Sequence, residues 1–401
     1  MVYQEFCLKR KNIIMKLNIT QSVYYVGVDD VEVRLFENQY PLAHGMSYNS
    51  YMICDDQIAV MDSVEANMVD RWIRQIEALL PAGRVPDYLV VHHMEPDHSA
   101  GIGMALDHWP DLKIVGSAKA ISMLSRFFPG RDFDGRTQVV AEGDMLNLGT
   151  HRLQFFAAPM IHWPEVMVSY EHTDHILFSA DAFGKFGALQ YDDDWTNEAR
   201  RYFINIVGKY GNQVQSLLKK LADPHICIIA PLHGPVLTDH LSRYLKLYDC
   251  WSSYRPETRG VLVAYGSIYG GTAEAALRIA EMLRQEDAGE IVVADLSTCE
   301  QSEAIAQAFR LSSMVVASPT YDASIYPAVY DFLHHLALKG YRNRRVGFIE
   351  NGSWAPTAAR QMRKMLEHLA GIEFADPVVT IVSRPDESTV ESLAALAKAM
   401  K

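Results

Sequence analysis

The sequence of 401 residues is poor in cysteine and has no long apolar run. None of its cysteines forms a CxxC pair; the five lie at positions 7, 54, 227, 250 and 299. An odd number of scattered cysteines argues against a disulfide scaffold and favours a reducing compartment, so we expect a cytoplasmic protein. It also excludes a built-in four-cysteine iron or zinc module. Because no apolar stretch reaches the roughly 18–20 residues of a membrane helix, we expect no association with a membrane.

Positive charge is also in short supply, with 37 Lys and Arg against 49 Asp and Glu, which gives a net charge of −12. Nucleic-acid binding needs clustered Lys and Arg to neutralise phosphates, so we expect no nucleic-acid partner. Hydrophobic residues make up 49% of the chain and charged residues 21%, which is typical of a globular protein with sizeable cores. The length exceeds that of one ordinary domain and indicates two or three.

Residues 1–20 are predicted to form an N-terminal extension. They are basic, but their apolar runs are too short and interrupted for a signal peptide. Met15 is a plausible alternative start, since strand-like sequence begins soon after it. Whether residues 1–14 belong to the native protein is therefore left open.

The C-terminal part, residues 258–401, alternates regularly between strand-like and helix-like segments. Runs such as GVLVAYGS, EIVVADLS and SMVVASPT are typical of buried strands, and TAEAALRIAEMLRQ between the first two is typical of a helix. Five such strands separated by helices predict a doubly wound parallel sheet in an α/β domain. A domain of this length with five strands fits the flavodoxin-like strand order.

The preceding part, residues 21–252, is less regular. Strand-like runs such as SYNSYMI, QIAVMDS and DYLVVHH are mixed with a helix, NMVDRWIRQIEALL, and with further strands joined by short turns. This mixture predicts an α+β domain with strands in two sheets and helices outside them. The polar, proline-containing stretch CWSSYRPETRG marks the expected boundary between the two domains.

The most distinctive motif is HHMEPDHSAG, at positions 92–101. Alternate residues of an extended chain point to the same side, so His93, Glu95 and Asp97 are predicted to share one site, with His98 just beyond. His92 should then point to the opposite face. So many ligand-type side chains would repel one another or be costly to bury without a cation. The alternative is a solvated acidic loop with surface histidines.

Three later residues favour a metal site. His162 follows one predicted strand, Asp181 ends the apolar run ILFSAD, and His233 ends the run IIAPLH. Taken singly, each of them is more typical of an ordinary hydrogen-bonded polar residue than of a ligand. Together they place further ligand-type side chains at strand ends, where binding sites are commonly built.

A phosphate-binding loop is predicted where AYGSIYGGTAEAA passes from a strand into a helix. Its small and hydroxyl-bearing residues allow backbone N–H groups to surround a phosphate at a helix N-terminus. No Walker-type lysine is present, and the spacing is not GxGxxG, so a monophosphate such as FMN is favoured over a nucleoside triphosphate or a dinucleotide. An ordinary glycine-bearing turn is the alternative. The candidate residues are Ser267, Ile268, Tyr269, Gly270, Gly271 and Thr272.

Two further loops at predicted strand ends strengthen the expectation of FMN. Ligands of doubly wound folds lie beyond the carboxyl ends of the strands. Tyr321 and Trp354 offer aromatic faces for a flat ring, although either could instead be a packing residue. The candidate flavin contacts in these loops are Pro319, Thr320, Tyr321, Asp322, Asn351, Gly352, Ser353 and Trp354.

The motif His-x-Glu-x-Asp-His, followed by an isolated His, Asp and His, resembles the metallo-β-lactamase superfamily over residues 30–250. The resemblance implies an αββα sandwich with a two-metal site. In the hydrolases of that superfamily the position of Glu95 is usually His, and a carboxylate there shifts the preference from zinc toward iron or manganese. Carried over, His93, Glu95, His162 and Asp181 would hold one iron, and Asp97, His98, Asp181 and His233 the other.

From about residue 20 to residue 401 the chain resembles the flavodiiron proteins, or A-type flavoproteins. SYNSYMI, HxExDHSAG, HWPEVMVSY, FSADAFG and SPT carry the resemblance. It implies an oxidoreductase that reduces O2 to water, NO to N2O, or both, with FMN and two non-haem irons. It also implies a separate electron donor, a rubredoxin or a reduced deazaflavin, and a head-to-tail homodimer or dimer of dimers.

Two alternatives remain beside this interpretation. One is a dinuclear zinc hydrolase with a flavodoxin-like accessory domain, against which Glu95 argues. The other is an FMN-binding electron carrier with a structural metal site, against which the full set of ligand-type residues argues. The sequence does not choose between O2 and NO.

Overall fold

The computed structural model describes residues 18–191 and 194–401. The predicted extension at 1–20 lies almost entirely outside the described residues. The chain divides into two compact units, Met1–Tyr202 with Asn212–Lys246 and Phe203–Gly211 with Leu247–Lys401. The domain limits proposed from the sequence, 21–252 and 258–401, remain predictions, because this division into compact units does not test them. Among the described residues, no helix combines the length and the apolar character needed to cross a membrane.

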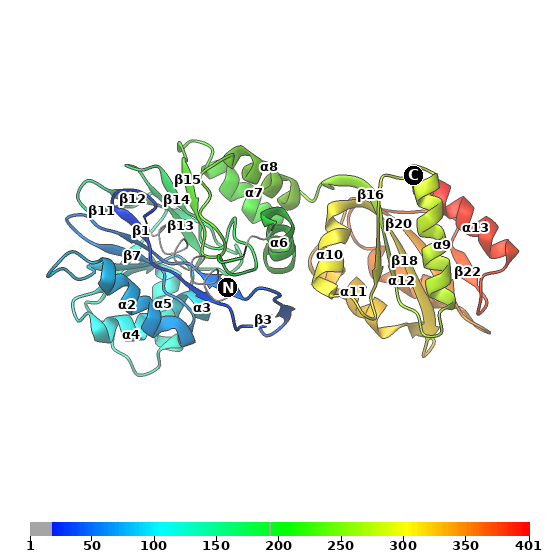
Figure 1. Ribbon diagram of the computed structural model, residues 1–401, viewed down its shortest axis with the longest axis horizontal. Coiled ribbons are helices and arrows are strands. Elements are labelled where there is room, and N and C mark those ends of the chain that lie inside the picture. Colours follow the sequence, from blue (N-terminus) through cyan, green and yellow to red (C-terminus); the bar gives the residue numbers. More distant parts are fainter. Residues whose placement is uncertain (1–17, 192–193) are drawn as a thin grey trace, which may run out of the picture. The chain divides into compact units, whose positions relative to one another are not determined.

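The first unit is a sandwich of two sheets, as predicted for an αββα fold (Figure 1). The first sheet, in spatial order, consists of β1 (Val23–Tyr25), β6 (Tyr51–Ile53), β7 (Ala59–Met61), β8 (Tyr88–Val91), β9 (Lys113–Ser117) and β10 (Thr137–Val140). The second consists of β11 (Met145–Asn147), β12 (Arg152–Ala157), β13 (Met167–Glu171), β14 (Ile176–Phe178) and β15 (Ile228–Ala230). Apolar side chains from both sheets, including Tyr51, Phe155 and Phe178, form one buried core.

Helices cover the outer faces of this sandwich. Figure 1 shows α2 (Val69–Leu79), α4 (Ile102–His108) and α5 (Ala118–Phe127) on one side and α7 (Gly211–Lys220) on the other. Helix α2 illustrates why these segments pack there. Val69, Trp72, Ile73 and Ile76 recur at helical spacing and are all buried, so one stripe of the helix faces the sheet. Helix α6 (Trp195–Tyr202) also belongs to this unit.

The second unit is a parallel sheet in the order β17–β16–β18–β20, which confirms the predicted flavodoxin-like fold. These strands are Glu290–Asp295, Thr258–Tyr265, Leu311–Tyr321 and Arg344–Asn351. The fifth strand is divided into β21 (Ile372–Phe374) and β22 (Val379–Ile381), both paired with β20. Pro377 lies between the two pieces and cannot donate a ladder hydrogen bond. A short β19 (Ser324–Ile325) adds a hairpin to β18.

Helices lie on both faces of this sheet. Helix α9 (Gly271–Gln285) runs beside α13 (Glu387–Ala399), and α10 (Gln301–Arg310) and α11 (Pro327–Leu338) cover the other face (Figure 1). Helix α12 (Ala358–Leu366) follows β20, and α8 (Leu241–Ser252) precedes β16. The loops after β16, β18 and β20 therefore meet at the carboxyl ends of parallel strands, where the sequence places the flavin.

Candidate functional site

The structure brings all seven predicted metal ligands together. They come from five separate segments: the turn after β8, the short helix α3 (Pro96–Ser99), and the loops after β12, β14 and β15. Six of the seven are buried, and Glu95 is half-buried. One detail differs from the prediction. Asp97 and His98 belong to a helical turn that Pro96 begins, rather than to an extended loop.

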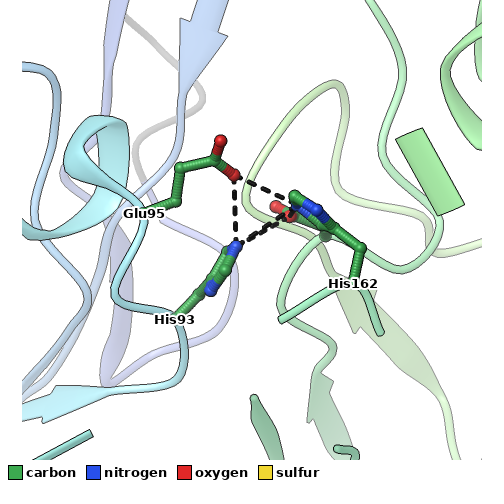
Figure 2. Close-up of side chains that lie close together, drawn as sticks. His93, Glu95 and His162 are labelled. Carbon is green, nitrogen blue, oxygen red and sulfur yellow. Dashed lines mark hydrogen bonds and ion pairs between the residues drawn. The ribbon is translucent and has the colours of Figure 1, made fainter. Parts of the chain in front are cut away.

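Four of these side chains surround one position (Figure 2). His93 Nε2 lies 3.2 Å from Glu95 Oε2 and 3.3 Å from His162 Nε2. His162 Nε2 lies 3.1 Å from Glu95 Oε2 and 3.2 Å from Asp181 Oδ2. A cation with four tetrahedral ligands at about 2.0–2.2 Å sets those ligand atoms about 3.3–3.6 Å apart. The spacing of this first set therefore matches a coordination shell.

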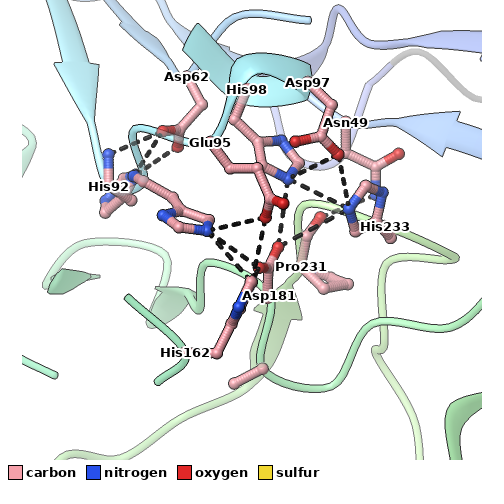
Figure 3. Close-up of polar contacts among 12 residues, drawn as sticks. Asn49, Asp62, His92, Glu95, Asp97, His98, His162, Asp181, Pro231 and His233 are labelled. Atoms are coloured by element: carbon pink, nitrogen blue, oxygen red, sulfur yellow. Dashed lines mark hydrogen bonds and ion pairs between the residues drawn. The ribbon is translucent and has the colours of Figure 1, made fainter. Parts of the chain in front are cut away.

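A second set lies beside the first and shares Asp181 with it (Figure 3). His98 Nε2 lies 3.1 Å from His233 Nε2 and 3.4 Å from Asp97 Oδ2, and His233 Nε2 lies 3.3 Å from Asp97 Oδ2. Asp181 faces this set with its other oxygen, Oδ1, at 3.2 Å from His98 Nε2. One carboxylate thus presents an oxygen to each set, as a bridging ligand does. These distances place His98 in the second set, with Asp97 and His233.

Hydrogen bonds at the far side of the imidazoles fix which nitrogen faces the centre. His93 Nδ1 donates to Glu165 Oε1 at 2.7 Å, and His233 Nδ1 donates to the backbone oxygen of Ser47 at 2.7 Å. A ring that donates from Nδ1 in its neutral form has an unprotonated Nε2. The Nε2 lone pairs of His93 and His233 therefore point to the same positions that the carboxylate oxygens of the two sets face. Such an arrangement requires either a cation or additional protons.

The pKa shifts describe how the cluster holds protons when no cation neutralises it. Burial opposes the charged imidazole, yet the carboxylates of Asp181 and Glu95 raise the pKa of His162 to about 9. Burial likewise opposes charge on His98, while Asp97 and Asp181 raise its pKa to about 8. Burial works against ionised Asp181, but the neighbouring imidazoles of His162 and His98 hold its pKa well below the usual range. The cluster is thus electrostatically suited to binding cations.

Several buried polar atoms at the centre have no hydrogen-bond partner among the described residues. These are both carboxylate oxygens of Asp97, Oδ1 of Asp181, Nδ1 of His98 and the hydroxyl of Tyr202. Unpartnered buried oxygens are costly, because desolvation is not compensated. Metal ions would satisfy the oxygens of Asp97 and Asp181. The residues present therefore fit a dinuclear metal site, with oxygen and imidazole donors that suit iron.

The SYNSYMI motif anchors the loop that carries His233. Asn49 Nδ2 donates to the backbone oxygens of Pro231 and Gly234, at 2.8 and 2.7 Å. The Tyr51 hydroxyl donates to the same oxygen of Pro231 at 2.5 Å. Residues of β6 and the turn before it thereby hold a loop of the second sheet in register, as Figure 3 shows for Asn49.

Sequence reasoning missed three residues beside the centre. Glu165 supports His93 from behind. The unpartnered hydroxyl of Tyr202 lies in the field of the site's carboxylates, although burial is the main reason for its raised pKa. Glu37 is an exposed residue at the tip of the hairpin β3 (Leu35–Phe36) and β4 (Tyr40–Pro41), and its pKa is raised to about 7 by partial desolvation and by Glu95. No local sequence pattern identifies any of these three residues, because the packing of distant segments places each of them beside the predicted metal site.

In the second unit, the predicted phosphate loop lies between β16 and the N-terminus of α9. Ser267 Oγ accepts the backbone N–H groups of Gly270 and Ala273, both at 3.2 Å. Gly270 has a φ of +86°, which favours glycine, and it caps α9. A Cβ added at Gly271 would lie 2.1 Å from the backbone oxygen of Ser383, so only glycine fits. The loop has the shape expected of a phosphate cradle.

The other two predicted flavin loops lie beside this one. Asn351 Nδ2 bonds Thr272 Oγ1 at 3.3 Å, and Thr320 Oγ1 accepts the N–H of Thr357 at 3.0 Å. Trp354 is 92% exposed, which is unusual for a tryptophan and leaves its ring face free for a flat ligand. Half-exposed Ile268 and Tyr321 and strongly exposed Tyr269 accompany it. Pro319 and Asp322 flank Tyr321, while Gly352 and Ser353 precede the tryptophan.

A fourth segment, absent from the predictions, lies beside the predicted flavin loops. Ser383 donates its backbone N–H to Asn351 Oδ1 at 3.0 Å, and its hydroxyl lies 2.8 Å from that of Ser353. Arg384 reaches the backbone oxygen of Tyr269 at 3.2 Å. This arginine places a positive charge beside the phosphate loop. Arg384 is distant from the phosphate loop in the sequence, so no local sequence pattern predicts that it lies there.

A further group of ligand-type side chains in the first unit consists of His151, Glu171 and Asp174. In this group the histidine and the glutamate already have hydrogen-bond partners within the protein. His151 bonds Asp55 through Nδ1 at 2.7 Å and Ser22 through Nε2 at 3.0 Å. Both oxygens of Glu171 accept backbone N–H groups. This group is a satisfied network, in contrast to the centre around Asp181.

Known proteins resemble the chain along most of its length. Residues 46–234, which include all seven predicted ligands, match the family model "ODP family beta lactamase". A nitric oxide reductase of Moorella thermoacetica is 28% identical over 79% of this chain and 81% of its own. The solved rubredoxin oxygen:oxidoreductase of the anaerobe Desulfovibrio gigas has a TM-score of 0.89 at 24% identity, covering 96% and 97% of the two chains. A flavodiiron protein of Giardia intestinalis has a TM-score of 0.86 at 24% identity, covering 96% of each.

The two solved structures share the fold of this chain, and the sequence relative is named a nitric oxide reductase. These relationships do not favour the zinc hydrolase with an accessory domain. Flavodiiron proteins carry FMN and a non-haem diiron centre, and the two sets of donors around Asp181 are candidates for such a centre. In its sequence relatives and in its fold, the chain is similar to the flavodiiron proteins.

Proposed function

We propose that this protein reduces O2 to water, NO to N2O, or both, at a diiron centre that receives electrons through FMN. The observation that carries the proposal is the position of Asp181, with one oxygen 3.2 Å from His162 Nε2 and the other 3.2 Å from His98 Nε2. The names of the nitric oxide reductase and the rubredoxin oxygen:oxidoreductase support the reaction class.

In this proposal His93, Glu95 and His162 would hold one iron, Asp97, His98 and His233 would hold the other, and Asp181 would contribute an oxygen to each set. Two ferrous ions and a two-electron flavin would together supply the four electrons that convert O2 to two water molecules. Glu165 and the backbone oxygen of Ser47 keep Nδ1 protons on His93 and His233 and direct both Nε2 lone pairs inward.

The protein's own groups also exclude water and bind the flavin. The rings of Phe36 and Tyr202 each lie 5.5 Å from the ring of His233, so the second set is walled by aromatic side chains. At the other cofactor, the loop Ser267–Thr272 receives the FMN phosphate, and Arg384 adds charge. Trp354, Tyr321 and the backbone at 351–353 would contact the isoalloxazine ring.

The chain's partners and assembly are part of the same proposal. A separate protein such as a rubredoxin, or a reduced deazaflavin, delivers electrons, and the name of the rubredoxin oxygen:oxidoreductase supports a donor of this kind. The protein is cytoplasmic and forms a head-to-tail homodimer or a dimer of dimers. In such a dimer the FMN of one subunit serves the irons of its partner.

Gas consumption by the iron-loaded, FMN-containing protein tests the reaction. We expect a chemically reduced donor to support O2 or NO consumption, Glu95→Ala to abolish it, and His151→Ala to leave it near the wild-type rate. Consumption of neither gas by wild-type protein with verified iron and FMN would overturn the proposal.

Mixed dimers test the head-to-tail arrangement. One partner carries Glu95→Ala, and the other carries Ser267→Asp, which opposes the phosphate while keeping an acceptor for the loop N–H groups. Each parent should be inactive, and dimers re-formed from both should regain activity, because an intact flavin then faces an intact iron centre. Inactive mixed dimers would show that electrons pass within one chain.

A further inference from the structure

His92, the residue beside the first predicted ligand, is buried and bonded on both sides. Its Nδ1 donates to Asp62 Oδ2 at 2.6 Å, and its Nε2 accepts from the Ser169 hydroxyl at 2.8 Å (Figure 3 shows the first contact). Asp62 follows β7 in the first sheet, and Ser169 lies on β13 in the second. All three are at most 1% exposed, so no substrate can reach this Ser–His–Asp arrangement.

Asp62 connects this arrangement to the metal site. Its second oxygen, Oδ1, accepts the backbone N–H of His92 at 2.7 Å and that of His93 at 3.3 Å. His93 is also held from the other direction, because Glu165 Oε1 accepts from its Nδ1 at 2.7 Å and from the N–H of Met94 at 2.9 Å. Two buried carboxylates therefore hold the backbone and the side chain of one ligand.

We propose that the buried chain Asp62–His92–Ser169 is a positioning device that sets the location of His93 Nε2 and thereby the metal affinity of the first set. The inference rests on the proposed function, since it assigns a role toward the iron held there. Metal ligands must be held to within about 0.5 Å of their productive position, and their hydrogen-bonded supports strongly affect affinity. His92 orients the Asp62 carboxylate, whose other oxygen then restrains the backbone that carries His93.

The simpler alternative is that His92 only braces the two sheets. The same domain supplies a matched control for that role. His151 makes the same pair of bonds, Nδ1 to Asp55 at 2.7 Å and Nε2 to Ser22 at 3.0 Å, and Asp55 again accepts the backbone N–H of its histidine. Among the described residues, His151 makes no hydrogen bond to any of the seven predicted ligands. Substitutions of His151 should therefore remove a similar structural contact without disturbing the position of any predicted metal ligand.

Two amide substitutions separate the two bonds of His92. His92→Asn places an amide donor near the position of Nδ1 and keeps the contact with Asp62, whereas His92→Gln reaches toward Ser169 and leaves Asp62 Oδ2 without its donor. His151→Asn and His151→Gln are the controls. For each protein we would measure ferrous-ion affinity by competition with a chromogenic chelator, and Tm in the iron-free state.

We expect about 10–100-fold weaker binding at one iron position in His92→Gln, the range seen when supports of metal ligands are lost. His92→Asn should stay within about threefold of wild type, and both His151 variants should keep wild-type affinity whatever their Tm. Wild-type affinity in His92→Gln, or equal loss in His92→Asn and His92→Gln, would overturn the inference.

If His92→Gln does not fold, Ser169→Ala removes only the outer hydroxyl of the chain and should still weaken iron binding by at least about twofold; unchanged affinity would count against the inference. These affinities do not depend on turnover. Wild-type protein that binds two irons but reduces neither gas would refute the proposed function alone, whereas unchanged affinity in the variants would refute the inference alone.

Discussion

His98 and His233 bring their Nε2 atoms to 3.1 Å from each other, although 135 positions separate them in the sequence. Both rings are fully buried, and Asp97 and Asp181 face the same point with oxygens that have no hydrogen-bond partner among the described residues. Folding a chain into this arrangement concentrates polar groups in a place where water is excluded, which is costly unless the groups bind something. The metal-free protein should therefore be less stable than the loaded one.

Replacing one ligand of the first set should remove one metal. Glu95→Ala deletes a carboxylate that lies 3.1–3.2 Å from His162 and His93 Nε2 and leaves the second set unchanged. We expect the iron content to fall from about two to about one per chain, with FMN retained. Inductively coupled plasma mass spectrometry and the flavin absorbance measure both quantities. Retention of two irons would show that Glu95 is not a ligand.

Removal of iron should lower thermal stability. A ligand present at about 100 times its Kd stabilises the folded state by about 2.7 kcal/mol, so a chelator should lower Tm by several degrees. Asp181→Asn weakens both sets at once, and its Tm should respond little to iron or chelator. Differential scanning calorimetry with and without chelator makes the comparison, and an equal response in wild type and Asp181→Asn would contradict the shared position of Asp181.

A negative charge in the phosphate loop should remove the flavin without affecting iron. Ser267→Asp keeps an oxygen that can accept from Gly270 and Ala273, but it repels a phosphate at the N-terminus of α9. We expect FMN affinity to fall at least about 100-fold, whereas Ser267→Asn, which is neutral and similar in shape, should lose much less. Fluorescence titration of FMN into flavin-free protein reports both. Equal losses in the two variants would mean that charge is not the cause.

Loss of the exposed tryptophan should affect the flavin rather than the irons. Trp354 is 92% exposed without a ligand, so its removal leaves no cavity in the core. We expect Trp354→Ala to weaken FMN binding about tenfold or to shift its reduction potential, with Tm and iron content unchanged. Redox titration followed in the visible spectrum checks the potential. Wild-type values of both affinity and potential would remove Trp354 from the flavin site.

The sequence predicted the parts of the site that depend on local order. His93, Glu95, Asp97 and His98 lie within six positions, so their proximity follows from the motif itself, although the helical turn at Pro96 was not foreseen. His162, Asp181 and His233 stood out as ligand-type residues at predicted strand ends, and only the family resemblance assigned them to particular irons. The sheet order of the second unit also followed from the regular alternation of strands and helices.

The supporting groups could not be read from the sequence, because they depend on how separate segments pack. Asp62 and Glu165 reach His93 from different sheets, and Ser383 contacts Asn351 from 32 positions further along the chain. No spacing rule connects such residues. Sequence patterns identify metal-ligand residues that are close together in the chain. The residues that orient those ligands are brought to them only by the packing of distant segments.

The most direct test of the account is X-ray diffraction from iron-loaded crystals, with anomalous data collected on both sides of the iron absorption edge. The account predicts two iron peaks per chain, one among His93, Glu95 and His162 and one among Asp97, His98 and His233, with Asp181 between them. Protein grown with ample iron that shows no iron peak at Asp181, or peaks only at the zinc edge, would contradict it.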